Sequence, residues 1–320
     1  MKRFALTLLP ALLVACSATG SGQNTGGSTA GSGGSTGGGL IGGSGGGIQT
    51  GGSGGGTSAD CDAASTYVYV LSDENDMYSF RPADKVFTKI GHLGCNTTLQ
   101  PNSMAIDRNA TAWVNYVDSG AFGDDTAGVV YRVSTKDASC EAQPAANLPQ
   151  GWFRLGMGFS TDGAAGSTAE TLYLTGTSSG SSPGLGKLDT TNGQLTPIGT
   201  FTGALAGENA ELTGTGDGRL YGFFTTTPVQ VVELNKTNGA TITPVSLPQV
   251  ETPAAWAFSF WGGDFYLYTA PDPLVDPTRT TNVTRYRPSD GSVDPNYMVN
   301  IGFRIVGAGV STCAPLEPPK

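Results

Sequence analysis

The stretch Gly158-Phe-Ser-Thr-Asp-Gly163, followed by Leu172-Tyr-Leu174, carries the pattern that decides the fold. An apolar strand runs into a tight Asp-Gly turn, and a second strand with an aromatic residue follows. Aspartate and glycine both tolerate the positive φ that the residues of tight hairpin turns require. The pattern occurs four times, with its turn aspartates 55, 55 and 47 residues apart: Asp107, Asp162, Asp217 and Asp264. A period of about 50 residues indicates repeated β modules.

A second recurring piece completes each module. It is a strand that ends in a polar turn and is followed by another strand, and its turns lie at 84–85, 136–137, 192–193, 238–239 and 290–291. Together the pieces give four short strands per module in five modules. The sequence therefore predicts an all-β fold, a five-bladed β-propeller of four-stranded antiparallel blades. A β-sandwich is the alternative, but sandwiches do not repeat at a fixed period.

The two ends of the repeat region are expected to meet. The first module begins at its second strand, residues 66–71, and the C-terminal run 306–310 can supply the missing inner strand. Closing the ring in this way removes an exposed sheet edge. Four cysteines remain in this region of an exported chain, an even number that suits disulfides better than free thiols. The closed ring pairs them as Cys61–Cys313 and Cys95–Cys140.

Residues 1–15 have the pattern of an export signal. A basic start, Met1-Lys-Arg3, precedes about a dozen mostly apolar residues, too few for the roughly 20 that span a bilayer. The end of the signal, Leu13-Val-Ala-Cys16, resembles the lipobox of bacterial lipoproteins. The resemblance implies that Cys16 is the first mature residue and carries two or three acyl chains, palmitate among them, which anchor it stably in a membrane. An ordinary cleaved signal is the alternative. Ser17, where an aspartate would favour the inner membrane, implies sorting to the outer membrane.

Residues 16–59 are expected to form a lipidated, flexible linker before a propeller domain at 60–320. Residues 17–59 hold 20 of the 49 glycines and no charged residue. Such a composition buries too little apolar surface to fold, and its r.m.s. span is roughly 35–40 Å. The formal net charge is −9, which argues against nucleic-acid binding because phosphates need a basic surface. We expect a monomer on the periplasmic or outer face of the cell envelope.

The sequence offers few residues for catalysis or metal binding. The only histidine, His92, ends a recurrent outer-strand motif and is expected to be structural. No P-loop motif occurs, and we expect neither a metal nor a cofactor. The run 73–76 is acidic but lacks the glycine and distal glutamate of an EF-hand loop. It is interpreted as a solvated turn.

The candidate binding face is assigned by analogy with other propellers. They bind ligands where the loops leading into the inner strands meet the loops that join strands two and three. In this chain the second set is long at 118–126, 177–183 and 270–280. The polar residues of the first set are the candidate ligand-binding residues: Asn102, Arg154, Glu208, Glu211 and Arg304.

Signal, linker and repeats together resemble the bacterial envelope lipoproteins that carry WD40-like or kelch-like propellers. The chain lacks the WD dipeptide and kelch's paired glycines in every blade, so no specific family is assigned. The resemblance implies a non-enzymatic binding or scaffolding face for an envelope protein or a glycan, or a purely structural role. The alternative is a carbohydrate-active hydrolase, whose acidic pair would come from Glu208, Glu211 and Asp107.

Overall fold

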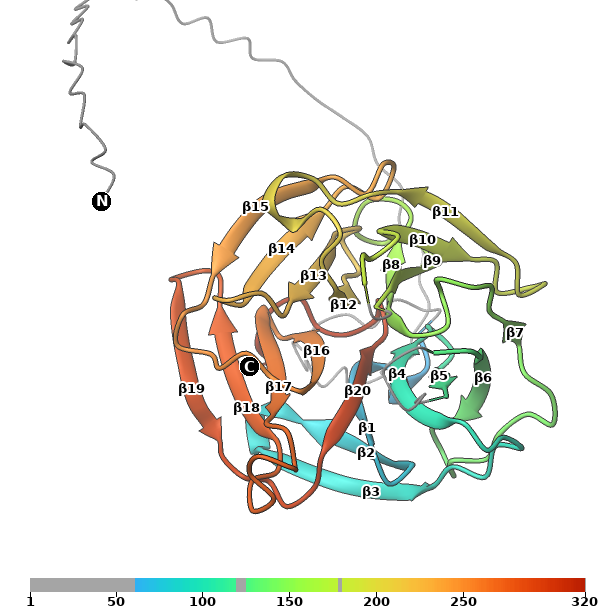
Figure 1. Cartoon of the computed structure of the whole chain (residues 1–320), viewed down its shortest axis with the longest axis horizontal. Helices are drawn as coiled ribbons and strands as arrows, with labels where there is room; N and C mark the ends of the chain where they lie inside the picture. Colours follow the sequence, from blue (N-terminus) through green and yellow to red (C-terminus); the bar gives the residue numbers. More distant parts are fainter. Residues whose placement is uncertain (1–60, 119–124, 178–179, 320) are drawn as a thin grey trace, which may run out of the picture. The chain divides into compact units, whose positions relative to one another are not determined.

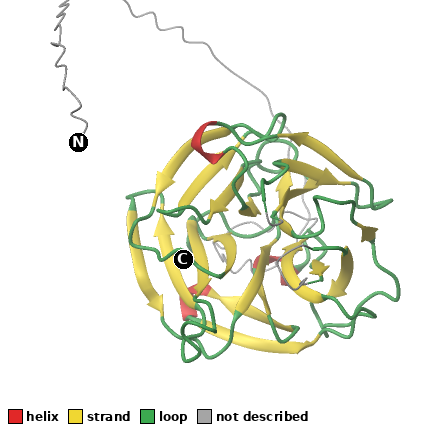
Figure 2. Cartoon of the chain, viewed as in Figure 1, coloured by secondary structure: helices red, strands yellow, loops and turns green. Residues whose placement is uncertain are grey.

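The computed structural model describes residues 61–118, 125–177 and 180–319. The signal segment, Cys16 and the linker up to residue 59 lie outside the described residues. Twenty strands in these ranges form five four-stranded antiparallel sheets arranged in a ring (Figure 1). Three short 3-10 helices are present in these ranges (Figure 2): η1 (Ala63–Thr66) precedes the first strand, and η2 (Pro82–Asp84) and η3 (Gly203–Leu205) lie between strands. The predicted five-bladed propeller is confirmed.

Four of the blades follow the chain from the inner to the outer strand. The second and third blades comprise β4 (Gln100–Ile106), β5 (Thr111–Val117), β6 (Gly128–Ser134) and β7 (Ala146–Asn147), then β8 (Leu155–Thr161), β9 (Glu170–Gly176), β10 (Leu185–Leu188) and β11 (Leu195–Gly199). The fourth and fifth comprise β12 (Ala210–Gly214), β13 (Leu220–Phe224), β14 (Gln230–Leu234) and β15 (Thr241–Ser246), then β16 (Ala255–Trp261), β17 (Asp264–Ala270), β18 (Asn282–Arg287) and β19 (Ser292–Met298).

The first blade closes the ring with strands from both ends of the chain. Its inner strand is β20 (Ile305–Val310), and β1 (Val68–Ser72), β2 (Asp76–Arg81) and β3 (Val86–His92) follow outward. β20 pairs antiparallel with β1, from Val68 opposite Val310 to Leu71 opposite Gly307. The sequence predicted this shared blade. Both disulfides follow the ring: Cys61–Cys313 ties the two ends of the domain, and Cys95–Cys140 joins the first two blades.

Small residues let the inner strands come close together at the centre. A Cβ on Gly307 or Gly309 of β20 would lie 3.0 Å from atoms of β4. Farther out, aromatic rings fill the space between blades. The Trp113 and Phe159 rings pack edge to face with their centroids 6.2 Å apart, and the Tyr221 and Phe265 centroids are 4.8 Å apart. These contacts make a rigid ring whose inner strands start at one pole. None of the helices in the described ranges is long and apolar enough to cross a membrane.

Candidate ligand site at the pole of the ring

One pole of the ring carries a cavity of about 290 Å³, here called the pole pocket. All five inner strands contribute to it, through residues just before their start or among their first three positions. The loop after β1 and the end of β9 complete the wall. The polar and aromatic lining residues are Asp73, Gln100, Asn102, Arg154, Thr177, Glu211, Trp256 and Arg304.

The structure brings four of the five candidate residues together in this pocket. Asn102, Arg154, Glu211 and Arg304 line it, whereas Glu208 is exposed and is not part of the lining. Asp107 lies beyond the far end of β4, where its carboxylate accepts hydrogen bonds from the Asn109 and Thr111 amides and shapes the turn. Neither acid therefore accompanies Glu211 at the pole.

Arg154 is held in place by a network at the starts of β4 and β8. Its guanidinium donates two hydrogen bonds to Asp125, at 3.1 and 2.9 Å, and one to the Asn102 side-chain oxygen at 2.9 Å. Asn102 in turn donates to Asn115 at 2.9 Å and to the Leu155 carbonyl at 2.7 Å. Because the Asp125 carboxylate is almost fully buried, this two-point ion pair fixes the arginine and cancels its charge.

Arg304 and Asp73 form a second, more loosely coupled pair of charges. The Arg304 guanidinium donates to the Pro271 carbonyl and makes no ion pair within 4 Å among residues 61–118, 125–177 and 180–319. The Asp73 amide donates to the Arg304 carbonyl at 3.0 Å, which places the two residues side by side. Partial desolvation raises the pKa of Asp73, and the Arg304 charge opposes that rise. Arg154 is thus ion-paired with an acid, whereas Arg304 has an acid nearby without a direct ion pair.

Glu211 is a buried carboxyl group near the axis of the ring. It is 3% exposed, accepts a hydrogen bond from the Ser103 hydroxyl at 2.5 Å and another from the Met157 amide at 3.1 Å. It thereby connects β12 with β8 and β4. Burial raises the pKa of Glu211 to about 8, although both hydrogen bonds act in the opposite direction. The group is therefore mostly protonated at neutral pH and can also donate a hydrogen bond.

Sequence reasoning missed Trp256, Gln100 and Asp73. Trp256, the second residue of β16, is partly buried at the pocket, and no described residue accepts a hydrogen bond from its indole nitrogen. The rule that selected Arg154 and Arg304, a residue leading into an inner strand, also applies to Trp256. Asp73 follows β1 in the loop that joins strands two and three of the first blade. The sequence analysis interpreted the run 73–76 as a solvated turn and did not assign Asp73 to the binding face, whereas the structure places Asp73 in the lining of the pole pocket.

His92 and the rest of the acidic run, residues 74–76, lie outside the pole pocket. The His92 ring contacts Asp76 at 3.1 Å, and Lys89 donates to the same carboxylate at 2.5 Å. These contacts hold the Asp76 pKa below its usual range although burial opposes them, and they tie β2 to β3. In the described part of the chain no group of three His, Cys, Asp or Glu side chains is placed to hold a metal ion.

The sequence matches no known family profile and no curated protein. Among solved structures, a gluconolactonase from Xanthomonas campestris is similar at a TM-score of 0.41 and 16% identity, over 63% of this chain and 68% of that one. A protein of unknown function from Bacteroides caccae is similar at a TM-score of 0.39 and 10% identity, over 76% of this chain and 97% of that one. Likeness at this level carries no information about ligand or activity.

Proposed function

We propose that this chain is a lipid-anchored protein of the cell envelope whose propeller binds a small, uncharged, polyhydroxylated ligand, a saccharide, in the pole pocket. The observation that carries the proposal is the set of groups that converge there. Amide, guanidinium and carboxyl groups offer donors and acceptors within one cavity, and Trp256 adds an aromatic surface with an unused indole donor. Such a mixture is typical of ligand pockets that recognise hydroxyl groups beside an apolar face.

The charge balance supports a neutral ligand. Arg154 is paired with Asp125, Arg304 lies beside Asp73, and Glu211 is mostly protonated at neutral pH. Each guanidinium group thus has a carboxylate as a neighbour, which weakens the attraction of the pocket for an anion, and every one of these groups can exchange hydrogen bonds with hydroxyl groups.

The place where the described chain begins in the domain is compatible with ligand capture. Residues 61 and 62 enter the domain beside Arg108, just past the end of β4, and the Asp62 amide donates to the Arg108 carbonyl at 3.3 Å. The pocket lies at the other pole, where the inner strands start. A domain attached in this way can present its pocket away from the membrane, on a linker with a span of roughly 35–40 Å.

Ligand binding is tested with protein lacking residues 1–59. We expect a glycan array to identify at least one bound saccharide, and Trp256→Ala to weaken its binding about tenfold in calorimetry, because stacking on the indole is lost. Tyr67→Ala is the matched control, since Tyr67 is an aromatic residue 41% exposed at the opposite pole. An array without binding, or equal losses in both variants, would contradict a saccharide site at this pole.

Anchoring is tested in cells of a Gram-negative host. Cys16→Ser should release the protein from the membrane fraction, because the side chain that would carry the diacylglycerol is gone. Ser17→Asp is the control: it keeps Cys16, so the protein should stay membrane-bound and shift toward the inner membrane. Continued tight association of the Cys16→Ser protein with membranes would rule out lipidation as the anchor.

A hydrolase is the second candidate, and one observation favours it. A carboxyl group that is protonated at neutral pH, as in Glu211, is suited to act as a general acid, and Asp73 supplies a second carboxyl in the same pocket. Turnover of 4-nitrophenyl glycosides that is abolished by both Glu211→Gln and Asp73→Asn would favour this candidate. Saccharide binding without turnover would favour the binding protein.

A further inference from the structure

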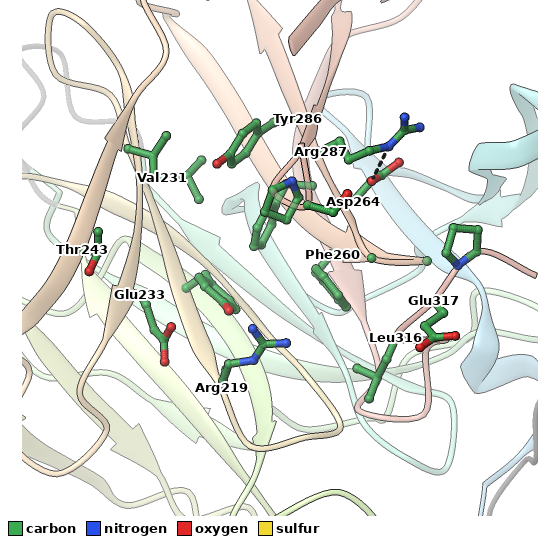
Figure 3. A pocket seen from close by; sticks show the side chains of 18 residues that line it. Arg219, Val231, Glu233, Thr243, Phe260, Asp264, Tyr286, Arg287, Leu316 and Glu317 are labelled. Carbon is green, nitrogen blue, oxygen red and sulfur yellow. Dashed lines mark hydrogen bonds and ion pairs between the residues drawn. The ribbon is translucent and has the colours of Figure 1, made fainter. Parts of the chain in front are cut away.

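A second, larger cavity of about 520 Å³ lies between the fourth and fifth blades (Figure 3). One wall is the face of β13, β14 and β15 that carries Tyr221, Glu233 and Thr243. The other wall comes from β16, β17 and β18, and the C-terminal residues 316–318 close one end. We call it the interblade pocket. No residue of the pole pocket contributes to it.

Four aromatic rings, those of Tyr221, Phe260, Phe265 and Tyr286, contribute to the lining of the interblade pocket. The Phe265 ring lies 4.8 Å from Tyr221, 5.3 Å from Phe260 and 6.0 Å from Tyr286, measured between ring centroids. The Tyr286 hydroxyl points across the cavity toward Val231 of the opposite blade (Figure 3) and has no hydrogen-bond partner within the described ranges. A cavity of this size, with an apolar lining and an unused polar group, has the features of a small-molecule site.

The rim of the interblade pocket carries more negative than positive charge. Its two arginines are already paired, Arg219 with Asp217 at 2.8 Å and Arg287 with Asp264 at 3.3 Å. Glu233 and Glu317 line the same cavity and make no ion pair in the part of the chain that the structure describes. Glu233 interacts electrostatically with Arg219, but the lining as a whole holds three carboxylates, Asp264 among them, against two guanidinium groups and is therefore net negative.

The rings reinforce this preference for a cation. The Arg219 guanidinium lies 5.6 Å from the centroid of Tyr221, so a cation already occupies one ring face. Phe260, Phe265 and Tyr286 have no such neighbour among the described residues. A positive charge within about 6 Å of an aromatic face is attracted to it, and more strongly where water is excluded.

We propose that the interblade pocket binds a small organic cation, a protonated amine on an aromatic or aliphatic body. The apolar body packs against Phe260, Phe265 and Tyr286. The ammonium group lies toward Glu233, and the Tyr286 hydroxyl is available for a polar substituent. This site is independent of the saccharide pocket at the pole.

The test uses the full-length chain and three probes of the same size, measured by ligand-observed NMR titration. They are 2-phenylethylammonium, the uncharged 2-phenylethanol and the anion phenylacetate. We expect the cation to bind about tenfold more tightly than the alcohol, and phenylacetate not to bind. Glu233→Gln should remove most of the difference between cation and alcohol.

Two tryptophan substitutions on one strand locate the site. Thr243→Trp fills the pocket from β15 and should weaken cation binding more than tenfold, whereas Ile242→Trp, on the opposite face of the same strand, should leave it unchanged. Trp256→Ala in the pole pocket should also leave it unchanged. Equal binding of all probes, tighter binding of phenylacetate, no binding of any probe at millimolar concentration, or insensitivity to Thr243→Trp would each overturn the proposal.

Discussion

Replacing Cys61 and Cys313 together by serine should lower the free energy of unfolding by roughly 5 kcal/mol. The bridge spans 252 residues, and the entropy that a cross-link removes from the unfolded chain grows with the length of the loop it closes. The same two cysteines hold β20 in place beside β1, so their loss also weakens the only blade built from both ends of the chain. Urea unfolding of the variant and the parent protein measures the difference.

The second disulfide provides the matched control. Cys95–Cys140 closes a loop of 45 residues, for which the same relation gives roughly 4 kcal/mol. It joins two blades that follow each other in the chain. We therefore expect its loss to lower stability without opening the ring, whereas loss of Cys61–Cys313 should also expose the β1 amides to hydrogen exchange. A stability within about 1 kcal/mol of the parent protein for the Cys61/Cys313 variant would contradict the closure argument.

Raising the pH from 5 to 8 should destabilise the protein, and Glu211 should account for most of the effect above pH 7. The folded-state pKa of Glu211 is about 8, against 4.5 for an ordinary glutamate, so the folded protein binds more protons than the unfolded chain between these values. Stability is then full below the unfolded pKa and falls as the pH rises toward the folded pKa. A shift of this size corresponds to on the order of 3–5 kcal/mol in total.

Glu211→Gln isolates this contribution. The variant keeps an oxygen for Ser103 and Met157 but cannot ionise, so between pH 7 and 8 its unfolding free energy should fall by about 1 kcal/mol less than that of the parent protein. Glu170→Gln is the control, because burial raises the pKa of Glu170 to only about 7. The unfolding free energy of the Glu170→Gln variant should still fall above pH 7. Below pH 7 it should fall less steeply than that of the parent protein. Parallel pH profiles for all three proteins would show that Glu211 is not protonated in the folded state.

The candidate site was only partly predictable, for a physical reason. In an inner strand a shift of one position turns a side chain from the pocket to the neighbouring blade, so the direction of each side chain depends on strand register. Glu211 and Glu208 are three residues apart, yet Glu211 lies inside β12 and is buried while Glu208 precedes the strand and is exposed. Both residues are glutamates, so the residue type alone could not show which of them lines the pocket.

By itself, the sequence determined the five modules, the shared first blade and the two cysteine pairs. Turn residues and strand pairing between chain neighbours are local properties, and the ring follows from repeating them at a nearly fixed period. The two pockets, in contrast, exist only in the folded ring. Trp256 and Asp73 come from different blades, and the C-terminal residues reach the interblade pocket only because the ring is closed. The walls of both pockets are assembled from segments far apart in the chain, and local patterning does not encode where such segments meet.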